Sequence, residues 1–199
     1  MGMDLMPMVF SSGWASGVNS YLVVLVLGFV ERFTDVTQIP DVLARTDVLV
    51  AAGVLYAWEF VADKIPYVDS TWDAISTVIR PTIGAVVGVL LAGDADTLEQ
   101  AVYGVVGGTS ALASHAVKAG TRLAINTSPE PVTNSIASVS EDITVLGVVM
   151  LAVYHPWIAL GVSVVLLVVG LVLLFFAMRL VRKGWRRWKG RREPAASTS

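Results

Sequence analysis

Apolar residues run through most of this chain in long stretches, which are separated by short segments rich in proline, glycine or acidic residues. A helix needs about 20 apolar residues to cross the hydrocarbon core of a bilayer, and most of these stretches approach that length. The pattern predicts an all-α, polytopic membrane helix bundle with about six spans. The expected spans cover residues 5–30, 48–61, 70–92, 101–125, 138–154 and 158–178.

The third and sixth expected spans differ in character from the others. Residues 70–80 suit a helix at the membrane interface, and Pro81 leads into the apolar run 82–92, so we expect one kinked span. In the alternative, residues 82–92 fold back as a re-entrant segment and five spans remain. Residues 158–178 are long, unbroken and uncharged, so we expect them to face lipid.

The two halves of the bundle share an order of features. Residues 8–92 and 98–180 each begin with a small, glycine-containing stretch, continue to a short span with two acids, and end in a third span. Three spans in each half give an inverted 3+3 repeat, as in transporters, with broken helices expected around residues 12–19 and 104–122. Close helix packing explains the glycines equally well.

The composition places the chain among integral membrane proteins. Hydrophobic residues make up 55% of the 199 residues and charged residues only 15%, and the mean hydropathy is +0.69. Cysteine is absent, which excludes disulfides, thiolate metal sites and cysteine nucleophiles. The residue spacings of hydrolases, zinc peptidases and nucleotide-binding loops are missing. We therefore expect a protein that is not an enzyme and holds no metal or cofactor.

Basic residues are concentrated at the carboxyl end. Eight of the fourteen lysines and arginines lie between Arg179 and Arg192, directly after the last apolar stretch. Basic residues that flank a span stay on the cytoplasmic side, so residues 181–199 are expected to form a cytoplasmic tail behind a bundle of residues 1–180. This explanation is preferred to nucleic-acid binding. Counting back six spans places the amino end in the cytoplasm too, in a protein of the cell membrane.

Three basic candidates follow one another near the end of the fourth expected span. His115, Lys118 and Arg122 are separated by three and four residues, so they share one face of a helix. Charged groups at membrane depth need partners or water. This face predicts a site for an anionic group. In the alternative, Lys118 and Arg122 extend to the membrane surface and pair with acids there.

Acidic candidates follow in the fifth expected span. Glu141 and Asp142 are expected near its start, where acids stabilise the N-terminus of a helix. The loop before them contains Asn126 and Asn134. If these asparagines close the loop, it holds Arg122 against Glu141 or Asp142, and we expect the pair to act as an inner gate.

Two further candidates lie in the first half of the chain. Glu59 stands in an apolar run, with Asp63 one helical turn later. Two acids at this spacing repel each other unless one is protonated or both share a cation. Asn19 offers either an uncharged ligand or a hydrogen bond across to the fourth span.

Several short segments resemble one known family. They are SGVNSY at 16–21, PYVDSTWD at 66–73, RPTIG at 80–84, HAVKAGTR at 115–122 and SPEPVTNSIASVSED at 128–142. With them, the chain resembles the uncharacterised bacterial membrane family known as domain of unknown function four-one-two-six, from about Ser11 to Pro156. The resemblance implies a small polytopic membrane protein. It brings no established activity, so the candidate residues rest on physical arguments.

Together these features favour a transporter or channel-like protein for a small polar or anionic solute, embedded in the lipid bilayer and working as a homo-oligomer or a monomer. The alternative is a non-transporting scaffold whose basic tail binds anionic lipid or a protein. A third reading, an enzyme acting on lipid phosphate, lacks an evident nucleophile. The candidate binding or gating residues are His115, Lys118, Arg122, Glu141, Asp142, Glu59, Asn19 and Asn134.

Overall fold

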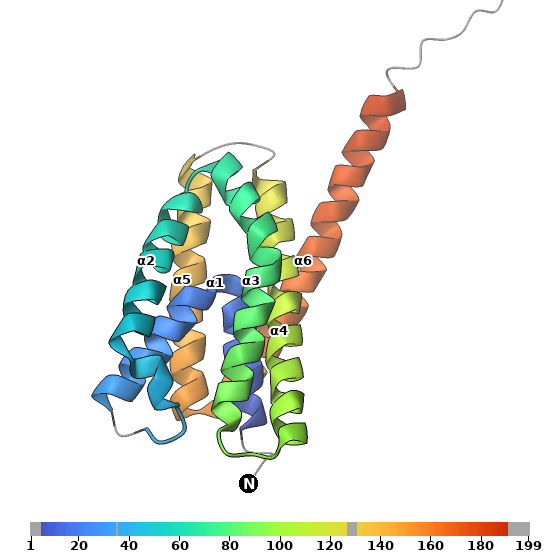
Figure 1. The fold of residues 1–199 in the computed structure, drawn as a ribbon. Helices are drawn as coiled ribbons and strands as arrows, with labels where there is room; N and C mark the ends of the chain where they lie inside the picture. The colour runs from blue at the N-terminus through green and yellow to red at the C-terminus, as the bar shows by residue number, and fades with distance from the viewer. Residues whose placement is uncertain (1–4, 35, 127–130, 191–199) are drawn as a thin grey trace, which may run out of the picture.

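The computed structural model describes residues 5–34, 36–126 and 131–190, and every element in this part of the chain is a helix (Figure 1). The expectation of an all-α fold is confirmed. The elements are α1 (Met6–Phe33), the short 3₁₀ helix η2 (Asp41–Ala44), α2 (Thr46–Ala62), α3 (Pro66–Ala92), α4 (Thr97–Ile125), α5 (Pro131–Tyr154) and α6 (Pro156–Gly190).

Prolines and one capping residue set most of the helix starts. Pro66, Pro131 and Pro156 are the first residues of α3, α5 and α6, a position where the missing amide hydrogen costs nothing. α4 begins behind Asp96, whose carboxylate accepts a hydrogen bond from the amide of Glu99 at 2.9 Å. The starts of α3, α4 and α6 lie within about four residues of the starts expected from the sequence.

Four helical segments are long and apolar enough to cross a membrane: Met6–Phe33, Tyr67–Ala92, Val132–Tyr154 and Pro156–Leu180. The chain is therefore an integral membrane protein. The segment in α6 is the least buried of the four, with 11% of its apolar window inside the protein, and Figure 1 shows the end of α6 standing away from the other helices. This segment therefore faces outward from the bundle, and its contact with lipid stays a prediction.

α1 is broken at Asn19, whose backbone torsions (φ −151°, ψ 95°) leave the helical region. In the arm before the break, residues 6–18, Gly17 lies against α4. In the arm after it, residues 20–33, Gly28 lies against η2 and the start of α2. The second arm thus returns toward the end of the bundle where the first arm begins (Figure 1). Each arm is about 20 Å long, less than the ~30 Å of a hydrocarbon core.

α1 also occupies the centre of the bundle, because it contacts each of the helices α2 to α6. Within its apolar window, 83% of the residues are buried. The buried residues include Ser11, Ser12 and Ser16. The small polar residues of the first arm therefore face other helices and not lipid.

α3 runs as one helix through Pro81, as expected for this segment, so the alternative of a separate re-entrant segment at 82–92 is wrong. One expected interruption is also wrong. α4 is continuous, so the break expected within residues 104–122 does not occur. The glycines of α4 serve instead as contact points for neighbouring helices. A proline in a membrane helix is tolerated where neighbouring groups satisfy the freed carbonyl.

The expected start of the fifth span is also wrong. α5 begins at Pro131 and not near residue 138, because the proline suits the first helical position. Glu141 and Asp142 therefore lie about three turns into the helix. They do not stabilise its N-terminus, and another explanation is needed for acids at this depth.

Glycines let α1, α3 and α4 approach one another closely. A Cβ atom at Gly17 would clash with the carbonyl oxygen of Ala111, and one at Gly107 would clash with that of Gly84. Small residues permit this kind of main-chain contact between membrane helices. The contact fixes the height of the first arm, and so it positions the break in α1 against α4.

Candidate functional site

Charged side chains gather inside the bundle around the break in α1. The three basic residues, Arg80, Lys118 and Arg122, are only 1% to 4% exposed. We call these residues, together with the carboxyl groups around them, the ionic network. Buried charges in a membrane protein are costly and mark functional sites more often than surface charges do. The carboxyl groups of the network belong to Glu59, Asp63, Asp69, Asp73, Glu141 and Asp142.

Arg80 joins α3 to α2 and α1. Its Nη2 donates to Oε1 of Glu59 at 2.5 Å, and its Nη1 lies 3.2 Å from Oδ1 of Asp73. Nη1 also donates to the carbonyl oxygen of Gly17 in the first arm of α1 at 3.4 Å. One guanidinium group is therefore shared by two carboxyl groups and also satisfies a main-chain oxygen near the break.

Lys118 on α4 lies at the centre of the network. Its Nζ donates to Oδ2 of Asp63 at 2.9 Å and to the carbonyl oxygen of Val18 at 3.0 Å. It also lies 3.4 Å from Oε2 of Glu141 and 3.6 Å from Oε1 of Glu59. Glu59 and Asp63 thus share the cation Lys118, which is one of the two alternatives that their spacing allowed, the other being a protonated carboxyl group.

Arg122 binds α5 through a two-pronged contact. Its Nε and Nη2 donate to the two carboxylate oxygens of Glu141 at 3.0 and 2.7 Å. Its Nη1 donates to the carbonyl oxygens of Asp63 and Asn134 at 3.2 and 3.3 Å. The expected pair between Arg122 and α5 is present, and Glu141 is the partner. Asp142 is not.

Asn19 holds the break in α1 together. Its Oδ1 accepts the amide of Leu22 at 3.0 Å and so caps the second arm. Its Nδ2 donates to Oδ1 of Asp142 at 2.9 Å. The hydroxyl group of Tyr56 donates to Oδ2 of the same carboxylate at 3.2 Å. Asp142 therefore ties the break to α5 and α2.

Two asparagines tie the ends of α3, α4 and α5 together. Nδ2 of Asn126 donates to Oδ2 of Asp69 at 2.8 Å, and Nδ2 of Asn134 donates to Oδ1 of Asn126 at 2.8 Å. The asparagine contact expected to close this connection is present. Residues 127–130 of the loop between these asparagines lie outside the described residues.

The hydrogen bonds of His115 identify its tautomer. Its Nδ1 faces Nη1 of Arg80 at 2.9 Å, so this nitrogen must be the acceptor. Its Nε2 faces the hydroxyl group of Thr77 at 3.1 Å, and that hydroxyl donates to the carbonyl oxygen of Asp73. Nε2 therefore carries the proton. His115 is neutral, and it adds no positive charge to the network.

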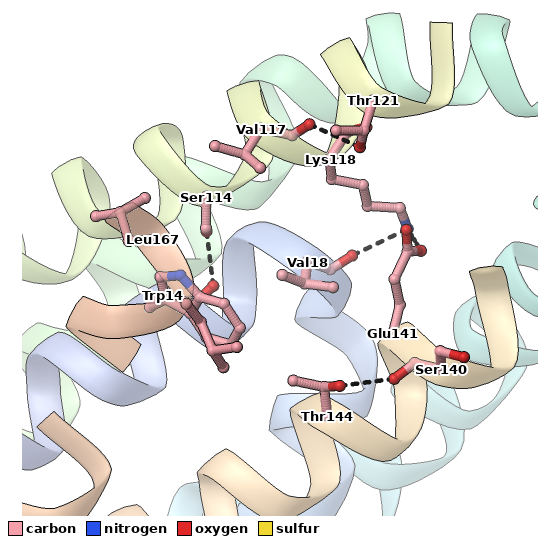
Figure 2. A pocket seen from close by; sticks show the side chains of 11 residues that line it. Trp14, Val18, Ser114, Val117, Lys118, Thr121, Ser140, Glu141, Thr144 and Leu167 are labelled. Carbon is pink, nitrogen blue, oxygen red and sulfur yellow. Dashed lines mark hydrogen bonds and ion pairs between the residues drawn. The ribbon is translucent and has the colours of Figure 1, made fainter. Parts of the chain in front are cut away.

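A cavity of about 220 Å³ opens beside the network, between α1, α4, α5 and α6. Figure 2 shows Lys118 and Glu141 pointing toward each other at one end, and Trp14 and Leu167 at the other. Val18, which precedes the break, also lines the cavity. The cavity thus has a charged end and an apolar end.

Asp63 lies in the turn between α2 and α3. Burial alone raises the pKa of its carboxyl group, but Lys118 and Arg122 outweigh this effect and hold the pKa below its usual range. Asp63 is therefore ionised at neutral pH, and Lys118 has at least one permanent anionic partner.

The structure brings all eight sequence candidates together in or against the ionic network. Their roles in binding or gating stay predictions. The candidate set omits Asp63, Asp69, Asp73 and Arg80. The sequence could have indicated Asp69, Asp73 and Arg80, because steps of four and seven residues place them on one face of a helix.

Comparison with family models gives one match. The model described as Domain of unknown function (DUF4126) matches residues 6–176, a segment that contains the whole ionic network. No curated protein and no solved structure matches the chain. Since the match covers most of the chain, from the start of α1 well into α6, the protein belongs to the DUF4126 family.

Proposed function

We propose that the protein is a membrane transporter for a small polar solute, which binds in the cavity beside Lys118 and Glu141. The observation that supports this proposal is the position of the cavity directly beside the break in α1, with Val18 in its wall. Broken helices expose main-chain and side-chain polar groups to a solute within the bilayer. Irregular backbone at membrane depth is tolerated where protein or a water-filled cavity surrounds it.

The cavity walls favour a neutral or zwitterionic solute. Lys118 and Glu141 offer opposite charges at one end, while Trp14 and Leu167 offer an apolar surface at the other. An anion is less suitable, because each basic side chain of the network already faces two or more carboxyl groups. An anionic solute would have to displace a carboxylate from its partner.

The arrangement of the helices suggests five spans and one re-entrant element. In this proposal the apolar helices α3, α5 and α6 cross the membrane, and α2 and α4, which are less apolar or shorter, cross beside them. α1, although long and apolar, is broken at Asn19 and enters and leaves on one side. The start of α1 and the end of α6 then lie on opposite sides, as they lie at opposite ends of the molecule in Figure 1. This topology replaces the six spans with both ends in the cytoplasm.

The charges at the two ends of the bundle support an orientation. Arg179 and Arg182 lie near the end of α6, which we place in the cytoplasm. At the other end, residues 94–99 contain three acids and no basic residue. We do not carry the inverted repeat into this proposal, because α1 is broken while α4, its counterpart, is continuous.

Osmotic swelling of proteoliposomes, followed by light scattering, tests the proposal. Glycine is the zwitterionic probe and acetate the anionic one. The wild-type protein should admit glycine faster than protein-free liposomes do, and it should not accelerate the entry of acetate. Thr144→Phe should abolish the glycine effect, because Thr144 lines the cavity and a phenyl ring would fill it.

Thr71→Phe is the matched control. Thr71 is exposed on α3, and its hydroxyl group bonds a carbonyl oxygen four residues earlier, as that of Thr144 does. This variant should admit glycine at the wild-type rate. Equal rates for wild type and Thr144→Phe, or no entry of either probe beyond that of empty liposomes, would contradict the proposal.

A further inference from the structure

The ionic network contains three more carboxyl groups than basic groups, and His115 is neutral. Four of the acidic residues are at most 4% exposed: Glu59, Asp63, Asp69 and Asp73. An unpaired charge in a buried site costs several kcal/mol even after the structure relaxes. A carboxyl group avoids this cost when it binds a proton.

Asp73 and Asp69 are the buried acids whose negative charge is least balanced by basic partners and hydrogen-bond donors. Neither oxygen of the Asp73 carboxyl group accepts a hydrogen bond from the described part of the chain, and its ion pair is with Arg80, which also holds Glu59. Oδ1 of Asp69 likewise accepts none, and its ion pair with Arg122 spans 3.9 Å. The two acids are one turn apart on α3, so their negative charges repel each other.

The surrounding groups do not remove this imbalance. The nearby Lys64, in the turn after α2, donates to the carbonyl oxygen of Phe60 at 2.6 Å and lies over its ring. The titratable and charged groups around the acid pair come from α1 to α5: Tyr21, Tyr56, Glu59, Asp63, Arg80, His115, Lys118, Arg122, Glu141 and Asp142.

We propose that the ionic network is a proton-binding site, in which the pair Asp73 and Asp69 holds a proton at neutral pH. A metal ion is a poorer ligand for this site, because no three His, Asp or Glu side chains of the described residues converge to hold one. Arg80 and Lys118 already stand between the carboxyl groups. A proton needs no coordination sphere.

Proton binding does not rest on transport, although in the transporter proposed above the bound proton serves as the coupling ion. Asp69 is hydrogen-bonded to Asn126 at the end of α4, so it is the member of the pair closer to the end of the bundle. Asp73 lies one turn deeper, beside Arg80.

Unfolding the purified, detergent-solubilised protein at about pH 7 counts the protons. Carboxyl groups of an unfolded chain ionise near pH 4, and imidazole is neutral above about pH 6.5. Protons held by the folded network are therefore released on unfolding, and a pH indicator in weak buffer records them. The wild-type protein should release up to three protons per chain, and Asp73→Asn about one fewer. Stability should fall as the pH rises, because the folded state holds more protons.

Two controls locate the protons. Asp94→Asn, at an exposed acid after α3, should release as many protons as wild type. The infrared absorption of protonated carboxyl groups should weaken in Asp73→Asn and Asp69→Asn but not in Glu141→Gln, since Arg122 holds the Glu141 carboxylate through two bonds.

Release of no proton from the wild-type protein would overturn the proposal, even if a variant failed to fold. Unchanged release and unchanged infrared absorption in both Asp73→Asn and Asp69→Asn would overturn the assignment to this pair. Neither measurement uses solute flux. Failure of the proton site is therefore distinguishable from failure of the proposed transport.

Discussion

Lys118 donates a hydrogen bond to the carbonyl oxygen of Val18, with 3.0 Å between the two atoms, directly before the break in α1. In an unbroken helix this oxygen would accept the amide of Leu22, which donates instead to the side chain of Asn19. An ammonium group on α4 thus replaces a main-chain hydrogen bond of α1. Changes in the network should therefore disturb the break, and changes at the break should disturb the network.

Lys118→Met should destabilise the protein by about 3–5 kcal/mol, because it leaves buried carboxylates without their cation. Denaturant unfolding in detergent, followed by circular dichroism, measures the effect. Arg45→Met is the control, since Arg45 and Asp47 form an ion pair whose side chains are 63% and 65% exposed. The control should leave the free energy of unfolding unchanged. Equal effects of the two substitutions would show that the ionic network does not stabilise the fold.

Arg122→Glu should lower the yield of folded protein, because it places a third carboxylate beside Asp63 and Glu141. Adding Glu141→Arg should restore much of the yield, since it rebuilds the pair with reversed charges. Adding Asp142→Arg instead should not, because Asp142 pairs with Asn19 and Tyr56. Size-exclusion chromatography of the detergent extract gives the yields. Rescue by Asp142→Arg, or by neither partner, would refute the assigned pair.

Gly17→Ala should cost about 1–3 kcal/mol, because the added methyl group meets the carbonyl oxygen of Ala111 and the hydroxyl group of Ser114. Gly147→Ala makes the same chemical change at a helical position with open space around it. It should stabilise the protein by up to about 1 kcal/mol through helix propensity. Thermal unfolding compares the two variants. If Gly17→Ala is as stable as Gly147→Ala, the close contact between α1 and α4 is wrong.

Single cysteines test the topology, because the native chain has none. Leu5→Cys and Thr97→Cys should react with a membrane-impermeant maleimide added to intact cells. Arg182→Cys should react only after the membrane is opened. Six spans would instead place Leu5 and Arg182 on the same side of the membrane. Labelling of Leu5→Cys only in opened cells therefore contradicts the re-entrant α1.

The class of the protein and several helix limits are predictable because they depend on neighbouring residues. Pro156 favours the first position of a helix whatever the rest of the fold, and the uncharged apolar run after it favours contact with lipid. The return of α1 at Asn19 is different. It depends on Lys118 and Asp142, which follow about one hundred or more residues later, so the local sequence shows only a small, polar stretch.

The candidate site was predictable in part for a similar reason. Lys118 and Arg122 are conspicuous because they lie in a long apolar segment. Asp69 and Asp73 are less so, because their segment was expected at the membrane interface, where acids meet water and need no partner. Their burial follows from the continuous α3, which carries this face into the bundle.

The central position of α1 has a consequence for how the protein is made. α1 leaves the ribosome before α4 and α5, yet Ser114 on α4 and Asp142 on α5 both bond directly to α1. Until they arrive, the amide of Asn19 and the main-chain oxygens at the break lack their final partners. α1 is thus made before α2 to α6 but reaches its native surroundings only after α5 is made. During membrane insertion α1 must therefore stay near the later helices until α5 is complete.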